Sequence, residues 1–209
     1  MVEAVTSYAQ SGAILGDPLL FERAERITYN ALPASMTKDT WERVYLQASN
    51  EYNATPSNPF IWYTDGGDSP VFGLESNYGC CTANMHAGWP KFTQRAVGWS
   101  VPSGAITVNM WAPLSATTPL GTVKIATDYP FGDVAVVTVT PASGAATPVW
   151  LRIPSWASKA TLSINGGAAT PLQGSNGTFF PTATGAAATT FTIQFNPDIR
   201  LCVLWLRTN

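Results

Sequence analysis

The chain has 209 residues, of which 45% are hydrophobic and only 11% are charged, and its formal net charge is −2. A core of ordinary globular size is therefore possible, and hydroxyl and amide groups carry most of the polarity. No cluster of Lys or Arg accompanies the aromatic residues, so neither nucleic acid nor an anionic membrane surface is an expected partner. Eight Trp and seven Tyr residues suit a neutral ligand such as a sugar.

Several features bear on the compartment in which the protein works. Three cysteines, Cys80, Cys81 and Cys202, do not describe a disulfide framework. Asn53 and Asn176 each begin a glycosylation sequon. No apolar run reaches the roughly 18 residues of a membrane span, and no charged-then-apolar leader opens the sequence. We therefore expect a secreted protein whose signal peptide is not part of this sequence.

The first third of the chain is expected to be helical, because apolar residues recur there at three- and four-residue spacing. Gly16, Asp17 and Pro18 supply a stop, an N-cap and a first-turn proline for a second helix. The apolar face of that helix runs to Ala31, and Pro33 is expected to end it. Residues 37–79 then show no sustained period, and a stretch of this size is usually functional.

Apolar residues from Met85 to Trp99 step by three and four, which predicts a third helix, with the helix proper beginning at Pro90 after a preceding turn. Beyond residue 102 the pattern changes to the alternation of short strands, as at Val134 and Val136. Asn165 and Gly166 form a strong hairpin signal.

The expected fold is therefore α+β and multidomain. Helical material fills residues 1–101, and an antiparallel β-sandwich, incomplete at its C-terminus, fills residues 102–209.

The adjacent thiols of Cys80 and Cys81 are the chief chemical candidates. Neighbouring Cα atoms are about 3.8 Å apart, whereas a disulfide prefers about 5.5 Å, so the two are not expected to pair. At the start of the third helical segment, free amide donors and the helix dipole would favour the thiolate, which suits a metal ligand or a nucleophile. Two small buried hydrophobic residues or a redox sensor are the alternatives.

Other side chains are weaker candidates. Glu75 could act as an acid or base if it stands near the thiols, or could simply bond loop amides. His86 could bind substrate, although a lone histidine at such a place is more often a structural donor. Trp62 and Tyr63 are candidates for stacking on a sugar. Asp65 and Asp68 are expected to form turns, and Glu3 is expected to face Arg23 or Arg26.

Several stretches carry a resemblance to a known family. They are FGLESNYGCCTANMHAGWPKF, GDPLLFERAERITYNALPASMT, WERVYLQASNEYNATPSNPFIWYTDGGDS, VWLRIPSWASKATLSING and FNPDIRL. Together they resemble the β-L-arabinofuranosidase family of glycoside hydrolases, family 127 and its relatives, in a fungal-like branch. The resemblance runs from about residue 2 to residue 201.

That resemblance implies the C-terminal part of an (α/α)6, or six-hairpin, barrel followed by a β-sandwich. It also implies a retaining glycosidase that acts on plant-type glycans, in which a zinc-bound cysteine attacks the sugar and a glutamic acid protonates the leaving oxygen. Cys80 corresponds to the nucleophile and Cys81 to a further zinc ligand. The physics is coherent, because zinc lowers the pKa of a thiol.

The family's Glu-x-Cys ligand pair and its acid would fall before Met1, and Cys202 has no counterpart. We therefore expect a truncated member that binds zinc weakly and has impaired or no activity. A non-catalytic carbohydrate-binding or structural relative is the alternative. Association is also expected, through barrel faces left exposed around Val5, Ile27 and Trp89.

Overall fold

The computed structural model describes residues 1–47, 53–56, 66–75 and 78–198. The chain divides into two compact units, Met1–Ala96 and Val97–Asn209. The first unit is helical and the second contains two β-sheets, so the fold is α+β. Strand structure begins at Val97, before the predicted boundary at residue 102.

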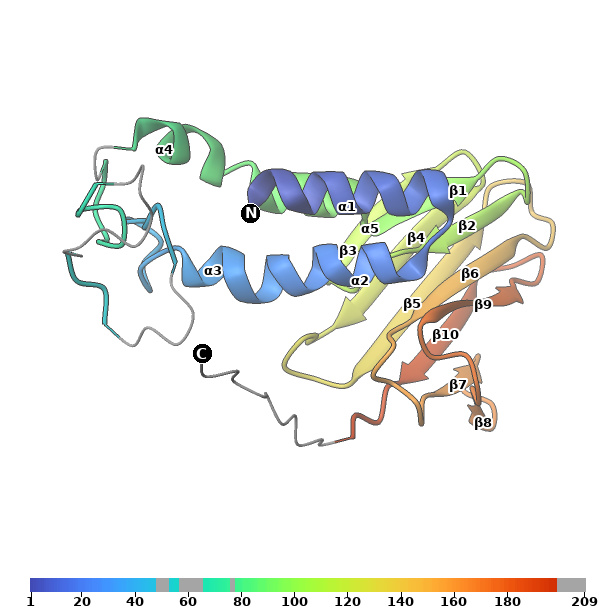
Figure 1. Ribbon diagram of the computed structural model, residues 1–209. Helices are drawn as coiled ribbons and strands as arrows, with labels where there is room; N and C mark the ends of the chain where they lie inside the picture. Colours follow the sequence, from blue (N-terminus) through green and yellow to red (C-terminus); the bar gives the residue numbers. More distant parts are fainter. Residues whose placement is uncertain (48–52, 57–65, 76–77, 199–209) are drawn as a thin grey trace. The chain divides into compact units, whose positions relative to one another are not determined.

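Two long helical stretches and one shorter helix form the body of the first unit (Figure 1). Helix α1 lies beside α2 and also contacts α5. Its buried residues follow the helical period, as its sequence predicts. The elements are α1 (Val2–Leu15), α2 (Pro18–Arg26), the π-helical η1 (Ile27–Ala31), α3 (Leu32–Ala34), α4 (Gly79–Met85) and α5 (Gly88–Ala96).

The turn between α1 and α2 is built as the sequence indicates. Gly16 adopts φ 67°, the left-handed conformation that glycine tolerates, and its N–H donates to the Gly12 carbonyl. The Asp17 carboxylate accepts from the Leu19 N–H at 2.9 Å, with Pro18 at the first helical position. The predicted stop, cap and restart are confirmed.

Pro33 does not end the second helix, contrary to the prediction. The chain widens into the π-helical turn η1, where the N–H of Leu32 donates to the carbonyl of Ile27. This register accommodates one extra residue per turn, so helical backbone continues through a proline that would obstruct a regular α-helix.

Two expectations about the helical surface are also wrong. Helix α5 stops at Ala96, so Trp99 lies in a strand and not on a helical face. Glycine inside a helix costs roughly 1 kcal/mol relative to alanine, and Gly98 follows the β-branched Val97, so the local preference is for strand. Val5 is buried rather than exposed, whereas Ile27 is half-buried and Trp89 is exposed.

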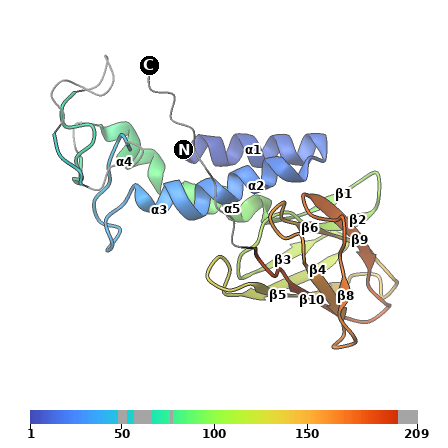
Figure 2. The same cartoon turned by 60° about the horizontal axis from the view of Figure 1, so that its bottom comes forward.

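The second unit contains two sheets that form separate layers (Figure 2). Their orders are β1-β2-β6-β9 and β3-β4-β5-β10-β7-β8. The strands are β1 (Val97–Ser100), β2 (Ala105–Val108), β3 (Leu114–Thr118), β4 (Gly121–Thr127), β5 (Val134–Pro141), β6 (Pro148–Ile153), β7 (Thr161–Ile164), β8 (Thr170–Pro171), β9 (Thr178–Ala183) and β10 (Thr189–Gln194).

Among the strands of the described residues the pairing is antiparallel, as expected, except between β2 and β6, which run parallel. Residues from both sheets meet in one hydrophobic core, including Ile106, Leu151 and Phe191. On β5 the buried face carries Ala135, Val137 and Val139, and Val134 and Val136 lie on the other face. Thr138 and Thr140 share that other face, so the period of two along the strand marks it as the outward one.

The hairpin signal at Asn165 and Gly166 is confirmed. Both residues have positive φ, 50° and 73°, and the Gly167 N–H closes the turn onto the Ile164 carbonyl at 2.9 Å. This is the pattern of a type I′ turn, which matches the twist of paired strands. Among the described residues, no helix has the length and apolar character needed to cross a membrane.

Candidate functional site

The two thiols lie at the start of α4, as predicted. The Tyr78 N–H donates to the Glu75 carbonyl at 3.0 Å, and the Cys81 N–H donates to the Tyr78 carbonyl at 3.0 Å. These bonds turn the chain into the short helix, with Cys80 exposed and Cys81 half-buried. Neither is in a disulfide, and the two Sγ atoms are 3.7 Å apart, far beyond the length of an S–S bond.

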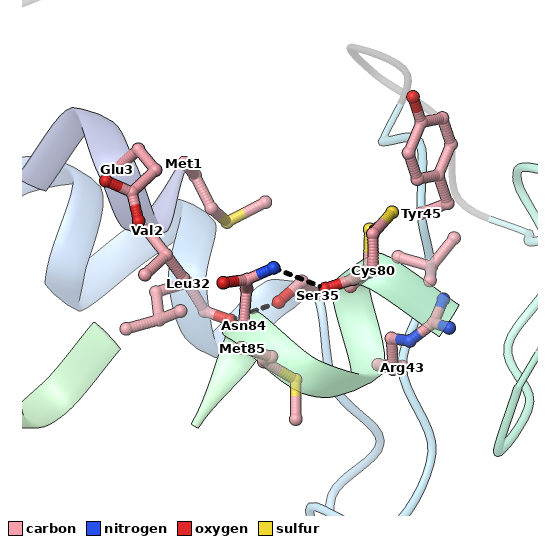
Figure 3. A pocket seen from close by; sticks show the side chains of 12 residues that line it. Met1, Val2, Glu3, Leu32, Ser35, Arg43, Tyr45, Cys80, Asn84 and Met85 are labelled. Carbon is pink, nitrogen blue, oxygen red and sulfur yellow. Dashed lines mark hydrogen bonds between the residues drawn. The ribbon is translucent and has the colours of Figure 1, made fainter. Parts of the chain in front are cut away.

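A cavity of about 450 Å³ lies against this thiol pair, within the helical unit. Figure 3 shows that its wall combines α1, the segment after α3, and α4. Besides the two thiols, its wall includes Glu3, Ser35, Arg43, Tyr45 and Asn84. The volume lies in the range of small-molecule sites.

Tyr45 and Asn84 have defined positions in this wall. The ring of Tyr45 stacks on that of Tyr78, with centroids 4.0 Å apart and planes 9° apart, and the residue is still 38% exposed. The Asn84 side-chain amide donates to the Cys80 carbonyl at 2.7 Å (Figure 3). Tyr45 therefore offers an aromatic surface to the cavity, and Asn84 fixes the backbone at Cys80.

Arg43 holds the segment that carries the cysteines. The residue is only 2% exposed, and its guanidinium donates to the carbonyls of Glu75 and Tyr78. It also donates to the hydroxyl of Thr82, from Nε at 3.0 Å, while that hydroxyl donates to the Leu74 carbonyl. Hydrogen bonds to a charged group are the stronger ones, so this buried cation fixes the start of α4.

Replacing Arg43 by methionine should therefore loosen α4. Hydrogen bonds to charged groups contribute about 1.5–3 kcal/mol each, so amides of α4 should exchange with solvent at least about tenfold faster. Hydrogen–deuterium exchange measures this directly. Arg23→Met is the matched control, since Arg23 is exposed and approaches the Tyr8 ring at 5.8 Å, a cation–π contact of a kind worth about 0.5–1 kcal/mol at exposed sites. Equal exchange in the two variants would contradict the assigned role of Arg43.

The electrostatic environment of Cys81 differs from the expectation. Burial raises the pKa of the Cys81 thiol, the neighbouring Cys80 raises it further, and Arg43 acts in the opposite direction. The predicted lowering by the helix start is therefore wrong for this thiol, because α4 is only seven residues long and burial outweighs its dipole. Without a bound cation, the Cys81 thiol stays protonated to higher pH than usual.

The thiol pair fits two corners of a zinc site. Tetrahedral zinc with bonds of about 2.3 Å to sulfur requires two sulfur atoms about 3.8 Å apart. The observed separation is 3.7 Å. Among the described residues, no group of three or more His, Cys, Asp or Glu side chains gathers at one point. These residues thus offer two thiolate donors, half of a closed tetrahedral set.

The other predicted site residues lie apart from the cavity or outside the description. Glu75 is exposed and its carboxylate lies over Gly79, and it is not part of the cavity wall. His86 is the exposed C-cap residue of α4 and does not line the cavity either. Trp62 and Tyr63, like Asp65 and Cys202, lie outside the described residues.

Glu3 forms an ion pair with Lys91 and not with Arg23 or Arg26, which was the expectation. Its carboxylate thereby connects α1 with α5, and it also lies at the cavity. Asn84 could have been found from the sequence, since it stands four residues after Cys80 and therefore on the same helical face. Nothing local marked Arg43 or Tyr45.

A comparison with models of known protein families finds a match in the second unit. Residues 105–195 match the family model described as β-L-arabinofuranosidase, GH127 middle domain. The matched residues lie within the β-sheet unit. The resemblance to this family is thereby supported by the β unit, and a comparison with curated proteins finds no match.

Solved structures share the fold over most of the chain. One is a GH127 β-L-arabinofuranosidase from Geobacillus stearothermophilus T6, with a TM-score of 0.70 and 16% identity over 91% of this chain. A protein described as a glycoside hydrolase gives 0.63 and 21% over 90%, and a GH127 β-arabinofuranosidase gives 0.59 and 15% over 90%. The chain spans about 30% of the length of each.

Proposed function

We propose that the chain supplies Cys80 and Cys81 to the active site of a retaining β-L-arabinofuranosidase of the GH127 type. The observation that supports this most directly is the pair of sulfur atoms 3.7 Å apart at the wall of a cavity of about 450 Å³. In this proposal the helical unit is the C-terminal part of an (α/α)6 barrel.

Cys80 is the nucleophile in this proposal, since its thiol is the more exposed of the two. Its sulfur attacks the anomeric carbon, a C–S bond forms, and the glycosidic C–O bond breaks. The leaving oxygen takes a proton from a carboxylic acid, and water then displaces the sulfur with net retention. Zinc, when bound by Cys80 and Cys81, would keep both thiols deprotonated at neutral pH.

The described residues around the thiols would bind and orient the sugar. Tyr45 offers a half-exposed aromatic wall for the apolar face of a furanose ring. Arg43 and Asn84 hold the backbone of the nucleophile in place. Glu3 is the carboxylate at the cavity, and its ion pair with Lys91 favours a structural role over proton transfer.

The two thiolate donors that the described residues offer cannot close a zinc site by themselves, so we expect turnover by this chain alone to be impaired or absent. A larger catalytic assembly would complete the site and provide the acid. The plant-type substrate suggested by the resemblance agrees with the aromatic wall at Tyr45 and with the small number of Lys and Arg residues, 11 in 209. The sequon at the exposed Asn176 agrees with action outside the cell.

A covalent probe tests this proposal without requiring turnover. The zinc-loaded chain is treated with an electrophilic epoxide of β-L-arabinofuranose configuration, and labelled peptides are identified by mass spectrometry. We expect label on Cys80, protection by free L-arabinose, and weaker labelling by the D-glucose analogue. Equal labelling of all three cysteines, or equal labelling by the L-arabinose and D-glucose epoxides, would count against Cys80 as the nucleophile. Binding of L-arabinose, measured by calorimetry, without labelling of any cysteine would favour the non-catalytic binding module.

A further inference from the structure

A second cavity lies within the β unit, remote in sequence from the cysteines. Its volume is also about 450 Å³. It is formed by the turn between β4 and β5, at Tyr129, Phe131 and Asp133, together with Trp156 from the loop after β6. Nothing in the proposed glycosidase chemistry uses these residues.

The aromatic side chains of this cavity are held in place by a residue of the core. Tyr129 and Trp156 lie nearly parallel, with ring planes 10° apart and centroids 6.4 Å apart. Both rings contact Phe195, which is fully buried, at centroid distances of 5.9 and 5.6 Å. Rings fixed by a core residue lose little conformational entropy when they bind a ligand. The two parallel rings therefore form a preorganised aromatic surface.

Phe131 is presented to solvent at the edge of that surface. It is 98% exposed, although burying such a side chain would stabilise the protein by roughly 1.5–3 kcal/mol. The backbone fixes this position, because the N–H groups of Phe131 and Gly132 both donate to the Asp128 carbonyl, at 2.8 and 3.0 Å. An aromatic ring held in water beside two half-buried ones points to a contact surface.

The charge of the residues that line the cavity limits which kinds of ligand it can bind. Asp133 is the one charged side chain among its described lining residues, and no Lys or Arg lines it. An anionic ligand would be repelled, whereas the carboxylate can accept hydrogen bonds from hydroxyl groups. A saccharide combines hydroxyl donors at its edge with an apolar C–H face that matches a flat aromatic surface. We infer that this cavity is a second, non-catalytic binding site for a neutral saccharide.

A cationic ligand is the main competing occupant, because aromatic rings with a carboxylate also attract ammonium groups. A cation is best enclosed by rings set at steep angles around it. The rings of Tyr129 and Trp156 are nearly parallel, at 10°, and so are not set at steep angles around one point, which favours the face of a sugar ring over an enclosed cation.

Calorimetric titration of the full chain tests the inference. The probes are soluble arabinogalactan, an arabinan oligosaccharide and tetramethylammonium chloride, and the variant is Phe131→Ala. We expect the wild-type chain to bind at least one saccharide and Phe131→Ala to bind it about tenfold more weakly, as for truncation of an aromatic contact residue. Val101→Ala is the matched control, an apolar residue that is 82% exposed in the same unit.

The variants separate this site from the cysteine pocket. Saccharide binding that depends on Phe131 should persist in Cys80→Ser, so the two proposals can fail independently. Absence of saccharide binding by the wild-type chain, or equal binding by Phe131→Ala, would overturn the inference. Binding of tetramethylammonium that depends on Phe131, without saccharide binding, would overturn it in favour of a cation site. Melting curves of Phe131→Ala should match the wild type, because the side chain is exposed.

Discussion

Zinc affinity should fall by more than about a hundredfold when Cys80 or Cys81 is replaced by serine. Loss of a residue that merely orients a ligand typically costs 10–100-fold in metal affinity, so loss of a thiolate ligand should cost more. A serine hydroxyl is not deprotonated at neutral pH and is a poor substitute for a soft sulfur ligand. The two single variants should behave alike, since the sulfur atoms occupy equivalent corners of the proposed site.

Competition between the protein and a chromophoric chelator measures this effect. The matched control is Cys202→Ser, which removes a thiol and leaves the pair intact. Wild-type affinity in both Cys80→Ser and Cys81→Ser would contradict the metal role. An equal loss of zinc affinity in Cys202→Ser would show that zinc binds to any thiol of the chain and not specifically at the cavity.

Replacing Phe195 by alanine should cost the β unit about 3–5 kcal/mol of stability. Phe195 is fully buried in the core that joins the two sheets, and its ring contacts Trp111, Tyr129 and Trp156. Its removal leaves a cavity that these fixed rings cannot fill. Denaturant unfolding followed by tryptophan fluorescence reports the change.

Phe131→Ala is the control for this prediction, because it removes the same side chain from a fully exposed position. Its stability should stay within about 0.5 kcal/mol of wild type. A loss below about 1 kcal/mol in Phe195→Ala would show that the core around the aromatic cluster collapses freely or is not formed as described.

Local signals in the sequence were reliable guides to local structure. Gly16, Asp17 and Pro18 end one helix and start the next, and Asn165 with Gly166 closes a hairpin. In each case the residue's own backbone preference decides the conformation, so no distant contact is needed. The change from helical to strand periodicity likewise separates the two units.

Predictions failed where tertiary structure decides between local options. Pro33 is tolerated because η1 changes the hydrogen-bond register one turn earlier. Trp99 fits the stepped apolar pattern of α5, yet the helix ends at Ala96 and Trp99 pairs with Ile106 of β2. Such choices depend on the packing partner and not on the segment itself.

The residues of the candidate site could likewise be predicted only in part. The thiol pair was visible in the sequence as two adjacent cysteines before a helical pattern. Arg43 was not, because its contacts with Tyr78 and Thr82 span 35 and 39 residues. An arginine whose hydrogen bonds reach residues so far along the chain leaves no periodic pattern in the sequence around it.

X-ray absorption at the zinc edge tests the central idea most directly, namely that Cys80 and Cys81 bind one metal ion together. The zinc-loaded chain should show two sulfur neighbours at about 2.3 Å, reduced to one in each single Cys→Ser variant. A first shell made only of nitrogen and oxygen in the wild-type protein would contradict the account.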